Sequence, residues 1–349
     1  MMRALWAVAA GALVWTSAAR AQDLPKTHLK VVGAWGNLSQ YKNFEAPFWT
    51  KEITEKSKGA LTAEITPFNE MGLKGAEIFR LMRLGVIDFG STVLGYVATD
   101  DARNEAIDLA GLAEDIDTAR KISDAYKPVY DAFYREKFGI KVLGIWPYPA
   151  QVIYCNGEIK SLADLRGKKV RTGNRTLAEF VEALGGSGVT LAFSEVVPAL
   201  QNKVVDCAIT GTLSGNAAKW HEVSNHIHAL PVGWSQVMHA VNAKRWDSLP
   251  PKVREFLQRE IAALEDRIWK ATAQETQQGF DCNTGKASCT LGTKAKMTLV
   301  PVSSSDRELV KKIVRETVVP KWAARCPGDC VPQWNQSIGK VLGIQAKAR

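Results

Sequence analysis

Apolar and polar positions between residues 161 and 210 follow a pattern that predicts short strands separated by helices. Residues 168–171, 189–192 and 204–209 are brief runs with the composition and flanking turn residues of strands. Because strands that alternate with helices usually lie parallel in one sheet, this region predicts an α/β fold. In such sheets, ligands bind beyond the carboxyl ends of the strands.

Helix-capping residues accompany these runs. Ser161 and Asp164 match a capping box that begins a short helix. Asn174 suits the N-cap of a second helix, which Gly185 ends. Ser194 is expected to cap a third helix. The three strands and the two helices between them therefore follow the order β-α-β-α-β.

A long helical pattern begins at Pro250. Its apolar residues are spaced three and four apart: Val253, Phe256, Leu257, Ile261, Leu264 and Ile268. This spacing predicts one amphipathic helix that reaches roughly to Gln278.

Residues 1–21 have the features of a secretory signal peptide. Arg3 precedes an apolar stretch over residues 4–14, and Ala19-Arg20-Ala21 forms a cleavage signal that predicts maturation at Gln22. The stretch is too short for a convincing membrane span. No cysteine follows the cleavage site, so we expect a soluble exported protein that has no lipid anchor and is not inserted in the membrane.

Removal of residues 1–21 leaves about 328 residues, a size that predicts two domains. The formal net charge of +9 falls to about +7, because residues 1–21 contain two arginines and no acidic residue. Lysines and arginines are dispersed among acids, without a stacked pattern of aromatic and basic residues, which argues against a nucleic-acid-binding protein. The charge instead favours solubility and a mild attraction for anions.

Arg171 is the first candidate for chemistry, because it falls where a strand should end and a helix should begin. A guanidinium is a planar fork of donors that matches a carboxylate, so its chemistry favours a carboxylate ligand. Thr210 ends another strand of the same region. The alternative for an arbitrary arginine is a solvated surface position without a ligand.

Two motifs carry a resemblance to a known family. Residues 164–172 read DLRGKKVRT, similar to the pattern D-L-K-G-L-K-I-R-V, and residues 193–207 read FSEVVPALQNKVVDC, similar to F-S-E-V-x-x-A-L-Q-x-x-x-V-D-G. The chain thereby resembles the solute-binding proteins of TRAP (tripartite ATP-independent periplasmic) transporters, the dicarboxylate-binding-protein family. Further similar segments, residues 67–90 and 248–251, follow in the family's order. The resemblance implies an α/β, two-lobed periplasmic-binding-protein fold with an interdomain cleft and a long helix spanning both lobes.

The resemblance also implies roles for individual residues. In that family the arginine of the first motif binds the substrate carboxylate, which here is Arg171. The phenylalanine of the second motif packs on the ligand, and the residue four past its aspartate lines the cleft, which implies these roles for Phe193 and Thr210. Two positions depart from the pattern: Cys207 stands where many members have a small residue, and Gln151 lies near the place of a second arginine in several acid-binding members. The second departure favours a ligand with one carboxylate.

The expected lobes each contain two stretches of chain. The first lobe comprises residues 22–148 and 236–272, and the second comprises residues 149–235 and 273–349. The C-terminal segment is expected to complete the second lobe, with one helical face formed by Leu309, Val310, Ile313 and Val314.

Aromatic residues near the crossings between the lobes are further candidates. Trp35 follows the first expected strand, Trp146 and Tyr148 lie beside the first crossing, and Trp234 lies near the return. Such rings can hold the apolar body of a ligand in a cleft, and the alternative is packing in the hinge or core. Asn174, the expected helix cap just beyond Arg171, joins the candidate binding residues.

Six cysteines in an exported protein favour disulfides. Short loops containing Gly or Pro favour the pairs Cys282–Cys289 and Cys326–Cys330. Cys155 and Cys207 could pair with each other or lie in the core as small apolar residues. The cysteine spacings do not match paired zinc-binding motifs, so no metal is expected.

Catalytic motifs are poorly matched. His221, Glu222 and His226 miss the H-E-x-x-H spacing of zinc proteases by one residue, and polar residues around a helix end are the simpler explanation for this segment and His228. Residues 211–215 read GTLSG, in which the serine is displaced from the centre of a G-x-S-x-G elbow. We expect neither an enzyme nor a cofactor.

These observations predict the periplasmic solute-binding subunit of a TRAP transporter. It would capture a carboxylate-containing organic acid, with an apolar or aromatic portion, in the cleft between the lobes and deliver it to integral membrane subunits. The alternatives are an ABC-type periplasmic binding protein for an anionic solute and an exported hydrolase.

Overall fold

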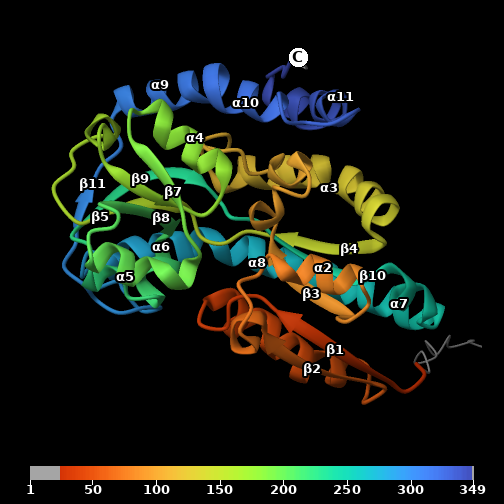
Figure 1. The fold of residues 1–349 in the computed structure, drawn as a ribbon. Coiled ribbons are helices and arrows are strands. Elements are labelled where there is room, and N and C mark those ends of the chain that lie inside the picture. Colours follow the sequence, from red (N-terminus) through yellow and green to blue (C-terminus); the bar gives the residue numbers. More distant parts are fainter. Residues whose placement is uncertain (1–23, 348–349) are drawn as a thin grey trace, which may run out of the picture.

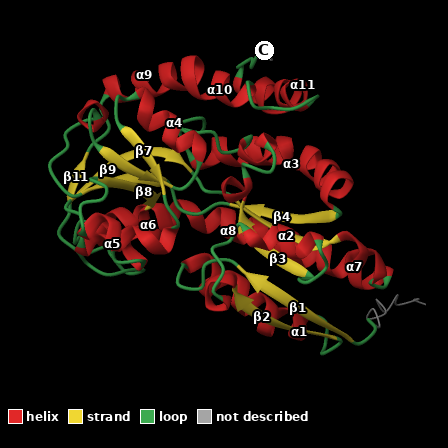
Figure 2. Ribbon diagram, viewed as in Figure 1, coloured by secondary structure: helices red, strands yellow, loops and turns green. Residues whose placement is uncertain are grey.

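The computed structural model describes residues 24–347, so the expected signal peptide, residues 1–21, lies outside the described residues. The chain forms two lobes, each built on one β-sheet with helices packed around it (Figure 1). Helices and strands alternate in both (Figure 2). The expected two-lobed α/β fold is confirmed.

The first lobe contains a five-stranded sheet in the order β2-β1-β3-β10-β4. Its strands are β1 (Thr27–Gly33), β2 (Leu61–Pro67), β3 (Phe89–Val93), β4 (Ile140–Trp146) and β10 (Val237–Asn242). β1 runs parallel to β2 and β3, whereas β10 runs antiparallel to both of its neighbours. The helices of this lobe are α1 (Ile53–Lys56), α2 (Glu77–Arg83), α3 (Ile116–Phe138) and α7 (Ala243–Ser248).

The second lobe contains a six-stranded sheet in the order β11-β9-β5-β8-β6-β7. Its strands are β5 (Gln151–Cys155), β6 (Lys169–Thr172), β7 (Ser187–Thr190), β8 (Cys207–Gly211), β9 (His226–Gly233) and β11 (Thr298–Val300). β6 is parallel to β7 and β8, as expected, but β5 is antiparallel to β8 and β9, so the sheet is mixed. Its first helices are α4 (Arg175–Ala183), α5 (Val196–Gln201) and α6 (Thr212–Ala217).

Two capping predictions are confirmed and one is wrong. Ser161 and Asp164 form a capping box, and the Asn174 side chain accepts a hydrogen bond from the backbone of the first turn of α4. Ser194 caps no helix. A 3₁₀ turn precedes α5 instead, and the Glu195 carboxylate reaches back to accept from the backbone N–H of Ala192 at 3.2 Å. Strands β7 and β8 are shifted by about two residues from the predicted runs, within the usual error at element ends.

The chain crosses between the lobes after β4 and returns after β9. The two crossing segments lie side by side, since the backbone N–H of Tyr148 donates to the carbonyl of Trp234 at 2.9 Å. The crossing segments include Pro149 and Ser235.

Helix α8 (Pro251–Asn283) is the third connection and extends five residues beyond the predicted end at Gln278. Its middle packs on the first lobe, where the Trp269 indole donates to the carbonyl of Ile145 at 2.8 Å. Its last turns pack on α6 so closely that a Cβ at Gly279 would lie 2.3 Å from the backbone nitrogen of Leu213. The helix therefore spans both lobes, as expected.

The C-terminal helices are α9 (Ser304–Ile313), α10 (Val319–Ala323), α11 (Cys330–Trp334) and α12 (Lys340–Leu342). The indoles of Trp322 and Trp334 donate to the backbone carbonyls of Ala102 and Ala106, which belong to the first lobe. The end of the chain thus packs on the first lobe, which differs from the expectation that residues 273–349 belong wholly to the second. Burial of the Trp322 and Trp334 indoles against the first lobe favours this packing of the C-terminal helices.

All six cysteines are paired. The expected Cys282–Cys289 and Cys326–Cys330 disulfides are present, and Cys155 is bonded to Cys207. The antiparallel pairing of β5 with β8 places Cys155 directly opposite Cys207, with their Cα atoms 4.0 Å apart. Helices long and apolar enough to cross a membrane are absent from residues 24–347.

Candidate functional site

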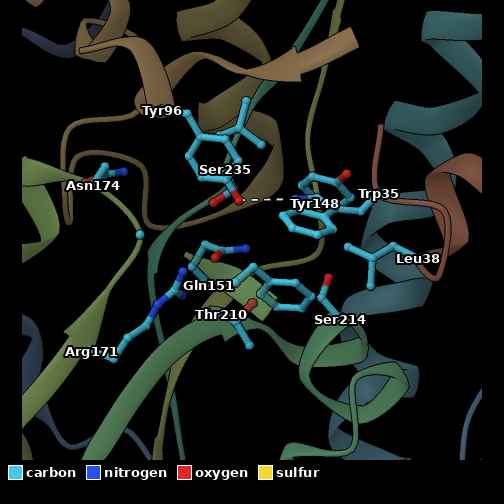
Figure 3. Close-up of a pocket in the computed structure, with 13 residues that line it drawn as sticks. Trp35, Leu38, Tyr96, Tyr148, Gln151, Arg171, Asn174, Thr210, Ser214 and Ser235 are labelled. Atoms are coloured by element: carbon cyan, nitrogen blue, oxygen red, sulfur yellow. Dashed lines mark hydrogen bonds between the residues drawn. The ribbon is translucent and has the colours of Figure 1, made fainter. Parts of the chain in front are cut away.

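A pocket lies where the two lobes meet the crossing segments (Figure 3). Its lining residues are Trp35, Leu38, Val93, Tyr96, Tyr148, Gln151, Arg171, Gly173, Asn174, Phe193, Thr210, Ser214 and Ser235. The cavity has a volume of about 30 Å³, room for roughly two water molecules. An organic molecule therefore enters only when the lobes or the lining side chains move apart.

Three strands of the second sheet bring polar side chains to this pocket. Because β5 is antiparallel to β8, its first residue, Gln151, pairs with Gly211 at the end of β8. Strand β6 runs parallel to β8 on the other side and carries Arg171 near its own end. Gln151, Thr210 and Arg171 consequently share one edge of the sheet, the edge where the sequence placed a ligand.

Arg171 is buried, with 3% of its surface exposed. Its Nε and Nη2 donate to the carbonyl of Leu191 at 3.0 and 2.8 Å, and Nη1 donates to the carbonyl of Ile209 at 2.9 Å. Three of its five N–H donors are thus used, and Nη1 and Nη2 keep one each. Burial lowers the pKa of Arg171 to about 10, so the guanidinium stays charged at neutral pH.

No carboxylate of the described residues forms an ion pair with Arg171 within 4.0 Å, and the partly exposed Glu195 carboxylate acts on its charge only from farther away. Its fixed bonds are to neutral backbone carbonyls, and the Trp220 ring lies 5.8 Å away. A buried cation of this kind is expected to attract an anion.

Aromatic rings form one wall of the pocket. The rings of Trp35 and Phe193 come from different lobes and have centroids 5.2 Å apart. The Trp35 indole donates to the Tyr96 hydroxyl at 3.2 Å, and burial raises the pKa of that hydroxyl. Phe193 packs in turn on Trp220 of its own lobe, with centroids 5.6 Å apart.

Two of the three candidate tryptophans do not line the pocket. Trp146 is stacked against His239 in the core of the first lobe, with centroids 5.5 Å apart. The Trp234 indole points away to donate to the carbonyl of Ala113 at 3.2 Å. Both residues stand at the crossings as expected, but their rings serve packing, which was the alternative for each.

Several lining residues were missed by sequence reasoning. Tyr96, Ser214 and Ser235 reach the pocket from a 3₁₀ turn after β3, from α6 and from the return crossing. Ser235 has a backbone φ of +43°, which is uncommon for a residue with a side chain. Tyr96 and Ser235 belong to no motif, Ser214 belongs only to the poorly matched GTLSG segment, and the folded arrangement brings the three together.

The histidine segment forms no metal centre, since no group of three or more His, Cys, Asp or Glu side chains in residues 24–347 could hold a metal ion. His226 and His228 lie in strand β9, so the expected helix end covers only His221 and Glu222. His228 is buried with its Nε2 3.4 Å from the Asp306 carboxylate, and it joins β9 to α9.

Comparison with known proteins agrees with this arrangement. The family model described as bacterial extracellular solute-binding protein, family 7, matches residues 35–317. The C4-dicarboxylate-binding periplasmic protein of Rhodobacter capsulatus is 27% identical over 235 residues, which are 66% of this chain and 70% of that protein. The sialic acid-binding periplasmic protein of Vibrio cholerae is 24% identical over 256 residues, 72% of this chain and 79% of that protein.

Solved structures show the same fold. A TRAP periplasmic solute-binding protein from Desulfovibrio salexigens with bound orotic acid has a TM-score of 0.79 at 17% identity, over 90% of this chain and 100% of that one. A Bordetella pertussis extracytoplasmic solute receptor binding pyroglutamic acid has a TM-score of 0.76 at 20% identity, over 89% of this chain and 99% of that one. The expected resemblance to TRAP solute-binding proteins is therefore confirmed.

Proposed function

The chain belongs to family 7 of the bacterial extracellular solute-binding proteins, and we propose that it captures an organic acid by holding one carboxylate on Arg171 between its lobes. The observation that carries this proposal is the buried guanidinium, which is bonded only to backbone carbonyls and has no carboxylate in ion-pair contact. Nη1 and Nη2 each have one free N–H, and such a pair matches the two oxygens of a carboxylate. The low dielectric of a closed cleft strengthens this contact.

A single carboxylate fits the charges of the pocket. Arg171 is the one cation among its described lining residues, and Gln151 stands near the place where the resembling acid-binding proteins have a second arginine. Orotic acid and pyroglutamic acid, the ligands of two proteins with this fold, each carry one carboxylate. Acids of that kind are the first we would test on this chain.

The rest of the ligand is expected to contain a flat or apolar portion. Trp35 and Phe193 offer ring faces from opposite lobes, and these rings can pack on the ligand once the lobes have closed over it. Thr210 and Asn174 supply further polar groups to the pocket, with Asn174 on the side of Tyr96 (Figure 3).

The transport role follows from the same premise. We propose that residues 1–21 direct export to the periplasm and that the closed, loaded form docks on the integral membrane subunits of a TRAP transporter. Ligand binding selects the closed form because the contacts from both lobes exist together only there. Genes for two integral membrane subunits without an ATPase beside this one would support the TRAP assignment over an ABC transporter.

The test is calorimetry on Arg171→Ala and Arg171→Lys with an acid found by a thermal-shift screen of mono- and dicarboxylates. Arg171→Ala should lose on the order of 3 to 5 kcal/mol, at least a hundredfold in affinity, because the carboxylate would be buried without its partner. Arg171→Lys should recover only part of this loss, since an ammonium lacks the planar fork.

Two results would contradict the proposal. Unchanged affinity of Arg171→Ala would remove Arg171 from the site. Chemical turnover of the bound acid by the purified protein would instead favour the exported-hydrolase alternative.

A further inference from the structure

The orientation of the Gln151 side chain is set by its neighbour. Its Nε2 lies 3.0 Å from the carbonyl oxygen of Pro149. A carbonyl can only accept, so the NH₂ end of the amide must face it. The carbonyl end, Oε1, accepts no hydrogen bond from the described residues and is left for the pocket that Gln151 lines. Gln151 therefore presents a fixed acceptor.

Asn174 is fixed in the opposite sense. Its Oδ1 accepts from the backbone N–H of Leu177 at 2.9 Å and from the Thr176 hydroxyl at 3.2 Å. A backbone N–H can only donate, so Oδ1 must face it and the NH₂ group is free for the pocket. Gly95 keeps this space open, because a Cβ there would lie 3.0 Å from the Asn174 Nδ2.

The pocket thus has donors from β6 and the start of α4, and an acceptor from β5. Arg171 and Asn174 offer N–H groups suited to a carboxylate, while Gln151 offers an oxygen and lies between Arg171 and the aromatic wall in Figure 3. The strands β5 and β6 are separated only by β8, about 10 Å from one backbone to the other. A compact ligand can therefore reach both groups.

The fixed acceptor, Gln151 Oε1, discriminates between ligands by the group that they place beside it. A second carboxylate beside Gln151 Oε1 would bring two acceptors together without a proton, and neither would be satisfied on burial. An ammonium group would be buried without a counter-charge, because the described lining residues include no Asp or Glu. An uncharged N–H or O–H satisfies the acceptor without either cost.

We propose that Gln151 is a specificity-determining residue, and that the preferred ligand is a monocarboxylate whose body carries an uncharged N–H or O–H donor that Gln151 Oε1 accepts. Lactam acids and 2-hydroxy acids have this chemistry. The inference rests on the proposed function, because it assumes that Arg171 holds the carboxylate.

Matched pairs of acids test the proposal by calorimetry on the purified protein. Pyroglutamate is compared with its lactone isostere, 5-oxotetrahydrofuran-2-carboxylate, in which the ring N–H becomes oxygen. 3-Phenyllactate is compared with 3-phenylpropionate, which lacks the hydroxyl. We expect the donor-bearing member of at least one pair to bind tenfold or more tightly, because the other member leaves a buried acceptor unpaired.

The variant Gln151→Met identifies the residue responsible. It removes the acceptor with little change of side-chain length, so the preference should fall to within about twofold. Gln236→Met is the matched control: Gln236 is also buried and donates to a backbone carbonyl, that of Ile107 at 3.2 Å, but does not line the pocket. It should keep the full preference. Thermal unfolding of each variant shows whether it is folded.

The outcomes separate this inference from the proposed function. Equal binding within both pairs, a preference that survives Gln151→Met, or binding of succinate while all donor-bearing acids fail would overturn the role of Gln151 and leave Arg171 as the carboxylate site. Failure of every acid would overturn both proposals.

Discussion

At the scale of single residues, charges buried without opposite charges mark both the pocket and its surroundings. Arg171 is held by backbone carbonyls alone, which fix its position but do not neutralise it. Glu275 of α8 is a buried acid and not a buried base, and burial raises the pKa of its carboxyl to about 7. A ligand can supply the charge that Arg171 lacks, whereas burial of Glu275 is eased because its carboxyl takes up a proton near neutral pH.

Glu275 predicts a pH-dependent stability. Its carboxylate accepts from Ser39 and Gln40 at 2.9 and 2.8 Å, next to the pocket residue Leu38, and its folded pKa of about 7 exceeds the ordinary value of 4.5. The unfolded chain therefore loses this proton first as pH rises, and the wild-type protein loses stability between about pH 4.5 and 7. Glu275→Gln lacks this titration. Its stability relative to the wild type should rise across that window, by on the order of 3 kcal/mol.

Urea unfolding at several pH values measures this difference. Other buried acids, such as Asp108, titrate in both proteins and cancel in the comparison. Glu255→Gln is the control, because Glu255 lies on the same helix but is exposed. A constant difference between Glu275→Gln and the wild type from pH 4.5 to 8 would show that Glu275 is ionised in the folded protein throughout.

Residues within the two motifs could be placed from the sequence, and so could Trp35, Gln151 and Asn174, which stand beside expected strand ends, crossings or helix caps. Arg171, Phe193 and Thr210 line the pocket because local strand and turn signals position them. Tyr96 belongs to no motif and reaches the pocket only because the turn after β3 faces the end of β6 across it. The position of Trp146 beside the crossing was predictable, but the direction of its side chain was not, because strand β4 is buried on both faces and alternation does not tell the two faces apart.

At the scale of elements, strands β5 and β8 form the base of the pocket and are joined by the Cys155–Cys207 disulfide. The sequence left this pair open, since only the register of two strands far apart in the chain brings these cysteines opposite each other. The helix α8 was predictable because its apolar spacing is local, although its end was not.

Removal of this disulfide should destabilise the fold more than it weakens binding. The bond closes 52 residues of chain, and opening such a loop costs about 2 to 4 kcal/mol through the entropy of the unfolded state. The backbone pairing of β5 with β8 remains, so the affinity of Cys155→Ala/Cys207→Ala for its acid should change by less than about threefold. Urea unfolding and calorimetry measure the two effects.

Cys326→Ala/Cys330→Ala is the matched control, because that bond joins residues only four apart. The shorter loop predicts a smaller loss of stability. A binding defect in the Cys155 and Cys207 variant that exceeds its stability defect would mean that the disulfide itself shapes the pocket.

At the scale of the whole molecule, one of the contacts between the lobes is an ion pair at their surface. The Lys74 ammonium of the first lobe lies 2.6 Å from the Glu195 carboxylate of the second, and both are partly exposed to solvent. Glu195 follows Phe193 closely in sequence, so this ion pair lies near the aromatic wall. It can exist only when the lobes are together.

The Lys74–Glu195 pair should therefore favour the closed form and tighten binding without touching the ligand. Lys74→Gln is expected to weaken affinity by less than about fivefold at low salt, since exposed ion pairs contribute little, and to match the wild type at 0.5 M salt, where the charges are screened. Lys160→Gln, which breaks an ion pair with Glu158 inside the second lobe, should have no effect at either salt concentration. Calorimetry at both salt concentrations measures these affinities. A loss of affinity in Lys74→Gln that persists at high salt would mean that Lys74 acts on the ligand or the fold, and not through closure of the lobes.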